Sequence, residues 1–88
     1  MDTKYNGWVN RETWACSLRL DNDFYDLKEV LKKSSKSWQD YSDKLRDLIY
    51  EMEQELKTNP SNELLDVFLD IGSLYRVDFD EIAKSDLN

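Results

Sequence analysis

Two pairs of carboxylates lie one helical turn apart along the sequence, Glu51 with Glu55 and Asp66 with Asp70. Such pairs can divide general acid and base work between them, but i,i+4 carboxylates on helices usually face solvent, and no nucleophile or phosphate-binding loop accompanies these. The chain has no histidine and one cysteine, Cys16, which excludes Cys–His nucleophiles and zinc sites. We therefore predict a protein that is not an enzyme, with no catalytic, cofactor-binding or metal-binding residues and no cofactor.

The acidic residues are concentrated in the last third of the chain. The net charge is −7, and residues 59–88 hold 7 acidic and 2 basic residues, whereas residues 1–58 hold 12 and 10. An acidic surface could occupy the positively charged nucleic-acid channel of another protein, although an ordinary solvated surface with helix caps is an equal alternative. The candidates for such a partner-binding surface are Asp66, Asp70, Asp78, Asp80, Glu81 and Asp86. The same acidity disfavours direct nucleic-acid binding.

The opening stretch is rich in residues that dominate binding hot spots, which are Trp, Tyr and Arg. The alternative partner-binding residues on this N-terminal arm are Tyr5, Trp8, Arg11 and Trp14. In a small domain, however, tryptophans more often supply core area. The two arginines, Arg11 and Arg19, could equally pair with acids of the last helix, which would make the arm purely structural.

Apolar spacing and capping residues predict an all-α fold, a compact bundle of about five short helices with an ordered N-terminal arm. Asn10 is a good N-cap for the first helix, although residues 14–20 also alternate as in a strand. Further helices are expected over about 24–33, over 38–58, between Pro60 and Gly72, and after an Asp78 cap. The chain is expected to be a single domain, 1–88, with an arm at 1–9, a helical core at 10–84 and a frayed tail at 85–88.

The chain carries no apolar run near the roughly 20 residues that cross a bilayer. Its N-terminus is polar and acidic where a signal peptide would be basic and then apolar. A lone cysteine also fits a reducing compartment. We therefore expect a protein of the host cytoplasm that does not bind membranes.

Both ends of the chain resemble a family of small proteins found in phages, plasmids and other mobile elements. The N-terminal match consists of Tyr5-Asn6-Gly7-Trp8, Asn10 and Glu12-Thr13-Trp14. The C-terminal match, in which an aromatic residue precedes glutamate-isoleucine-alanine, consists of Val77, Phe79 and Glu81-Ile82-Ala83. The resemblance implies a mobile-element origin and a small helical domain, and it brings no known activity with it.

Small size, acidity and this resemblance together favour a phage-type anti-defence protein. It would inhibit a host CRISPR or restriction effector by protein–protein contact, either by mimicking nucleic acid with its acidic surface or by clamping the effector. The expected partner is a host defence protein or nuclease complex. The alternative is a small non-catalytic adaptor that binds through its arm. The apolar stripe of the third helix is wide enough for a homo-oligomer interface as well as a core.

Overall fold

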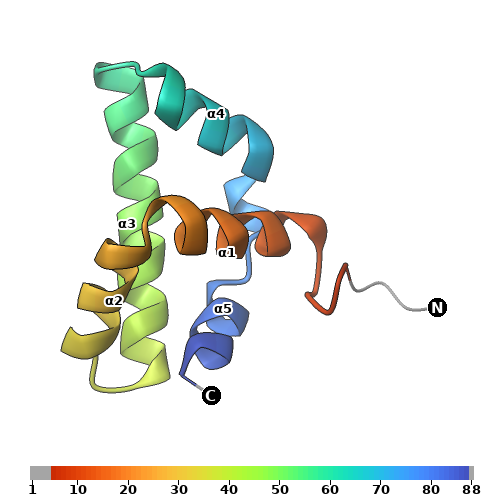
Figure 1. Cartoon of the computed structure of the whole chain (residues 1–88), viewed down its shortest axis with the longest axis vertical. Coiled ribbons are helices and arrows are strands. Elements are labelled where there is room, and N and C mark those ends of the chain that lie inside the picture. Colours follow the sequence, from red (N-terminus) through yellow and green to blue (C-terminus); the bar gives the residue numbers. More distant parts are fainter. Residues whose placement is uncertain (1–4, 88) are drawn as a thin grey trace.

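The computed structural model describes residues 5–87, and this part of the chain forms five α-helices and one 3-10 turn (Figure 1). The elements are α1 (Arg11–Asp23), α2 (Tyr25–Ser34), α3 (Trp38–Thr58), α4 (Asn62–Ile71), η1 (Leu74–Arg76) and α5 (Phe79–Asp86). The predicted all-α fold is confirmed, and the ambiguous stretch 14–20 is helical. Residues 1–4 of the predicted arm and residue 88 of the predicted tail lie outside the described part.

Polar side chains fix the starts of four helices. Asn10, Ser37, Ser61 and Asp78 each accept a hydrogen bond from the backbone N–H three residues later, at the beginnings of α1, α3, α4 and α5. Each bond satisfies one of the amides that a helix start leaves without an intrahelical partner. α2 begins directly after Phe24, which also ends α1. Four of the five α-helix starts among the described residues therefore follow local capping signals in the sequence.

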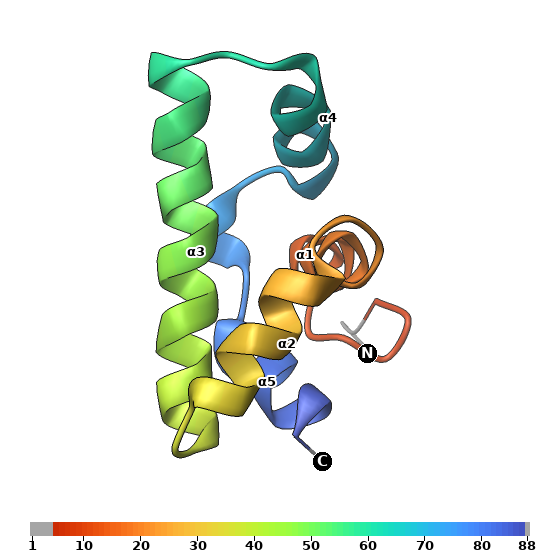
Figure 2. The same cartoon turned by 60° about the vertical axis from the view of Figure 1, so that its left-hand side comes forward.

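The long helix α3 is the spine of the bundle, and it contacts α2, α4 and α5. The axis of α1 runs crosswise to that of α3 and not parallel to it, as both views show (Figures 1 and 2). In this position α1 contacts α2, α4, η1 and α5, so it joins the first and last thirds of the chain.

The core is formed where these helices meet. Its buried apolar residues are Ala15, Cys16, Leu20, Tyr41, Leu45, Ile49, Val67, Ile71, Leu74, Val77, Phe79, Ile82 and Ala83. Trp8, Trp14 and Trp38 are partly buried against this cluster. Burial raises the pKa of Cys16 to about 12, so at neutral pH the thiol is a small buried hydrophobe and not a nucleophile.

A buried polar cluster ties the end of the chain to the core. The Tyr41 hydroxyl donates to Asp86 Oδ2 at 2.7 Å, and the Lys28 ammonium, itself buried, contacts both Asp86 and Asp21. Burial lowers the pKa of Lys28, but the hydrogen bond to Asp21 and the charge of Asp86 outweigh it, so this pKa lies above its ordinary value. α5 continues through Asp86, so the predicted tail, 85–88, begins within this helix, and these contacts hold the Asp86 carboxylate.

Candidate functional site: a tyrosine and arginine groove

The N-terminal arm is a tight turn closed by two backbone hydrogen bonds. Tyr5 N–H donates to the Trp8 carbonyl at 2.6 Å, and Trp8 N–H donates to the Tyr5 carbonyl at 2.8 Å. Asn6 and Gly7 between them have φ of 48° and 89°, a combination that Asn-Gly tolerates better than most dipeptides. The Tyr5 ring lies 5.1 Å from the Trp14 ring, between centroids, so the turn packs back onto α1.

The polar groups that follow the turn bind the C-terminal third of the chain. Asn10 Nδ2 donates to the Arg76 carbonyl at 2.7 Å, and the backbone N–H of Val9 donates to Glu81 Oε1 at 3.0 Å. The hydroxyl of the fully buried Thr13 accepts from the backbone N–H of Asp78 at 2.9 Å. The two sequence signatures therefore meet in the structure, and their polar residues hold the two ends of the chain together.

Arg11 and Arg19 hold α1 against α4, not against the last helix as the structural alternative supposed. The Arg11 guanidinium donates to the carbonyls of Asp70 and Ile71, both at 2.8 Å, and so caps the end of α4. Arg19 forms ion pairs with Asp70, Asp23 and Asp66 at 3.0 to 3.1 Å. Hydrogen bonds to Asp70 and Asp23 raise the pKa of Arg19.

The six acids expected to form one binding surface are divided between two places, and each has an internal partner. Asp66 and Asp70 lie together on α4 beside Arg19. The other four lie at α5, where Asp78 caps the helix, Asp80 accepts from Ser42, Glu81 from Val9 and Asp86 from Tyr41. Among the side chains in the ion pairs named above, that of Asp66 is the most exposed, at 74%.

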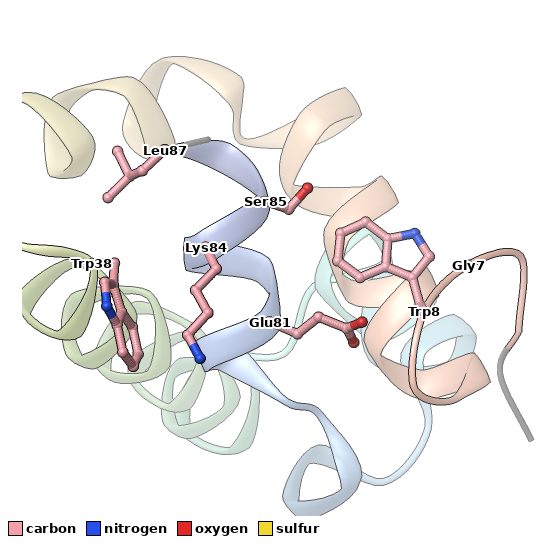
Figure 3. A pocket seen from close by; sticks show the side chains of 7 residues that line it. All are labelled: Gly7, Trp8, Trp38, Glu81, Lys84, Ser85 and Leu87. Atoms are coloured by element: carbon pink, nitrogen blue, oxygen red, sulfur yellow. The ribbon is translucent and has the colours of Figure 1, made fainter.

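Of the four arm residues, Tyr5 is exposed and the other three are half-buried. Arg11 is engaged in capping α4, and Trp14 packs on Tyr5 and the core. Tyr5 is exposed, and Trp8 lines a shallow depression beside α5 that Trp38 borders on the other side (Figure 3). Within this depression the Lys84 ammonium lies 4.3 Å from the centroid of the Trp38 ring.

A second depression, on another part of the surface, combines residue types that the first one lacks. It is lined by Arg46 and Tyr50, one turn apart on α3, and by Tyr75 and Arg76 in η1. Leu74, Val77 and Phe79, whose side chains are buried, also line it, and its volume is about 510 Å³. We call this depression the tyrosine–arginine groove.

The chain direction after α4 explains why Tyr75 and Arg76 point outward. Gly72 ends α4 with φ of 89°, a conformation that L side chains rarely adopt. The tight η1 turn then buries the two residues on either side of this pair, Leu74 and Val77. Tyr75 is 86% exposed, the most open of the large apolar side chains in residues 5–87, and the Arg76 side chain is 57% exposed.

Sequence reasoning missed the tyrosines and arginines of the groove, although it named Asp78 and Asp80, which also line it. The available signal was an aromatic–arginine pair three residues after a helix-ending glycine, in a loop that had to pass over the core. The other half of the groove was harder to find, because Arg46 is exposed among many charged neighbours on α3 and Tyr50 is partly buried against the core.

The described residues contain neither a candidate metal site nor a membrane-spanning helix. No three Cys, Asp or Glu side chains in this part of the chain are arranged to hold a metal ion. The helices within residues 5–87 include none that is both long and apolar enough to span a membrane. The tyrosine–arginine groove presents aromatic, guanidinium and apolar groups at the surface.

Comparisons with known proteins place the chain in a family without adding an activity. No curated protein and no solved structure is detectably similar to it. A family profile, however, matches residues 1–87, nearly the whole chain. The protein therefore belongs to DUF7249, a family of unknown function.

Proposed function

We propose that this protein is a non-catalytic binding protein that engages another protein through the tyrosine–arginine groove. The observation that carries the proposal is that the exposed Tyr75 lines one depression together with Arg46, Arg76 and buried apolar side chains. Tyrosine and arginine are enriched among the residues that dominate protein–protein binding energy, particularly where they surround a pocket that can be desolvated. A volume of about 510 Å³ could accommodate one or two partner side chains.

The internal engagement of the acids supports this surface over an acidic one. Asp70 is paired with Arg19, and Asp86 with Tyr41 and Lys28, so a partner would have to compete with existing contacts for these carboxylates. Duplex DNA carries one charge per roughly 1.7 Å of its axis. Acids divided between α4 and α5 reproduce little of that pattern.

The resemblance to mobile-element proteins supplies the class of partner to test first, a CRISPR or restriction effector of the host. In this proposal the protein inhibits the effector by occupying a protein surface through the groove. A partner outside host defence would make the same protein an adaptor that uses the same groove.

The test is capture of partners by the tagged full-length protein from lysate of a host with active defence systems, with identification by mass spectrometry. The wild type is compared with Tyr75→Ala and with Tyr25→Ala, a matched control because Tyr25 is also exposed but lies on α2, outside the groove. We expect a defence component to be captured by the wild type and by the control, and lost with Tyr75→Ala.

Three other results would change the proposal. If Tyr75→Ala still captured the same partner, the groove would not be the binding site. Capture that survives Tyr75→Ala but fails with Asp66→Lys would restore the acidic surface. Capture of a partner unrelated to defence, lost with Tyr75→Ala, would support the adaptor role and exclude the inhibitor role.

A further inference from the structure

We infer that the tyrosine–arginine groove recognises a carboxylate that lies next to an apolar or aromatic side chain on the partner protein. This inference rests on the proposed function and specifies its chemistry. It starts from the arginines, of which the chain has four. Arg11 and Arg19 are engaged in holding α4, whereas Arg46 and Arg76 both line this one groove.

The guanidinium groups of the groove retain donors for a ligand. Among the described residues, Arg46 has one ion pair, from Nη2 to Asp43 at 2.8 Å, and Arg76 has one, from Nε to Glu12 at 3.4 Å. A guanidinium has five N–H donors, and these two side chains are 50% and 57% exposed. The planar donor edge of arginine matches a carboxylate with two parallel hydrogen bonds.

The other groups of the groove indicate what accompanies the carboxylate. Tyr50, Tyr75 and the exposed Val9 line the groove together with the buried apolar side chains named above. An apolar or aromatic group placed there would lose contact with water, which is favourable in proportion to the area covered. It would also exclude water from the neighbouring carboxylate–guanidinium contact and so strengthen it.

The negative charge of the molecule favours a protein ligand with a single carboxylate over a nucleic-acid ligand. The net charge is −7, and Asp78 and Asp80 also line the groove. A polyanion would bring many phosphates towards these acids, whereas a partner with one carboxylate at the arginines and apolar groups elsewhere avoids most of that repulsion. Aspartate, glutamate or a chain terminus could supply the carboxylate.

The experiment uses small probes and NMR spectra of the full-length protein. N-acetyl-phenylalanine carries the carboxylate and the aromatic group, N-acetyl-phenylalanine amide lacks the carboxylate, and phenyl phosphate replaces it with a phosphate. The readouts are the Nε–Hε resonances of Arg46 and Arg76 and the ring resonances of Tyr50 and Tyr75. We expect the carboxylate probe to shift these signals at millimolar concentration and to bind at least fivefold more tightly than the amide.

The variant Arg46→Gln/Arg76→Gln should remove the difference between carboxylate and amide, whereas Lys33→Gln, a charge removed from α2 and outside the groove, should keep it. Equal binding of the two phenylalanine probes, or no shift at these residues, would overturn the inference. Tighter binding of phenyl phosphate would overturn it in favour of a phosphate-bearing ligand. If the probes fail but Tyr75→Ala still abolishes partner capture, the groove binds a protein by other chemistry, and the proposed function survives alone.

Discussion

The seam between α1 and α4 and the tyrosine–arginine groove each contain two arginines, and the two pairs have different surroundings. In the seam, Arg11 donates to two backbone carbonyls and Arg19 contacts three carboxylates. In the groove, Arg46 and Arg76 each have one carboxylate partner within residues 5–87. The same side chain therefore holds helices together in one region and remains available to a ligand in the other.

The tyrosines differ in a similar way. Tyr41 is fully buried, and its hydroxyl donates to Asp86, whereas Tyr75 extends from η1 into solvent. Position in the fold explains the difference, since Tyr41 lies on the side of α3 that α5 covers and Tyr75 lies in a turn between two buried residues. Residue type alone would not separate structural from binding side chains in this chain.

The largest loss of stability is expected from Arg11→Ala in the seam between α1 and α4. Loss of the guanidinium leaves the carbonyls of Asp70 and Ile71 without their donor at the end of α4, and hydrogen bonds to charged groups contribute about 1.5 to 3 kcal/mol each when they are buried. Because one of the two bonds is exposed, we expect the free energy of unfolding in urea to fall by about 3 kcal/mol. A change below about 0.5 kcal/mol, the range of ordinary surface substitutions, would show that the seam does not depend on this cap.

Gly72→Ala tests the same seam through the backbone. Gly72 has φ of 89°, and a Cβ built on it would lie 3.0 Å from Arg11 Nη2. Conformations that L residues rarely adopt cost of order 1 to 3 kcal/mol, so we expect about 2 kcal/mol of destabilisation. In the Arg11→Ala background the cost should be smaller, because the close contact is absent. Equal costs in the two backgrounds would mean that the guanidinium moves aside freely.

Tyr41→Phe tests the buried tyrosine, with an expected loss of about 1.5 kcal/mol at pH 7 because the hydrogen bond to the Asp86 carboxylate is removed. Burial, and then the contact with Asp86, raises the pKa of Tyr41 in the folded chain. The unfolded chain therefore releases this proton first, and wild-type stability falls as pH rises above about 10. The difference in unfolding free energy between wild type and Tyr41→Phe should have its full value below that pH and should be smaller at pH 11. A gap that widens at pH 11 would contradict the assigned shift.

Much of the fold could be predicted from the sequence because its signals are local. Asn10 and Asp78 cap the helices they precede, and the apolar stripe of α3 has the spacing of a buried helix face. Two contacts at the start of α5, however, come from residues far away in the sequence. The backbone N–H of Asp78 donates to Thr13, and the Glu81 carboxylate accepts from Val9.

The candidate site could not be predicted in the same way, because its parts come from distant segments. Arg46 and Arg76 are thirty positions apart, about six helix turns and a chain reversal, and no periodicity links them. Similarly, Arg11 finds its partners 59 and 60 residues away. The sequence does not reveal that α1 packs against α4, so the six acids were expected to form one surface and Arg11 to be a free hot-spot residue.

The smallest effect on stability is expected in the groove. Arg46→Gln/Arg76→Gln removes two exposed ion pairs, each worth between 0 and about 1 kcal/mol, so we expect unfolding in urea to change by about 0.5 kcal/mol or less. The matched substitution in the seam, Arg19→Gln, should lower the melting temperature clearly, because three carboxylates would then lie together without their cation. If the groove variant were instead the less stable of the two, its arginines would be structural, and its loss of the difference between carboxylate and amide probes would no longer locate a binding site.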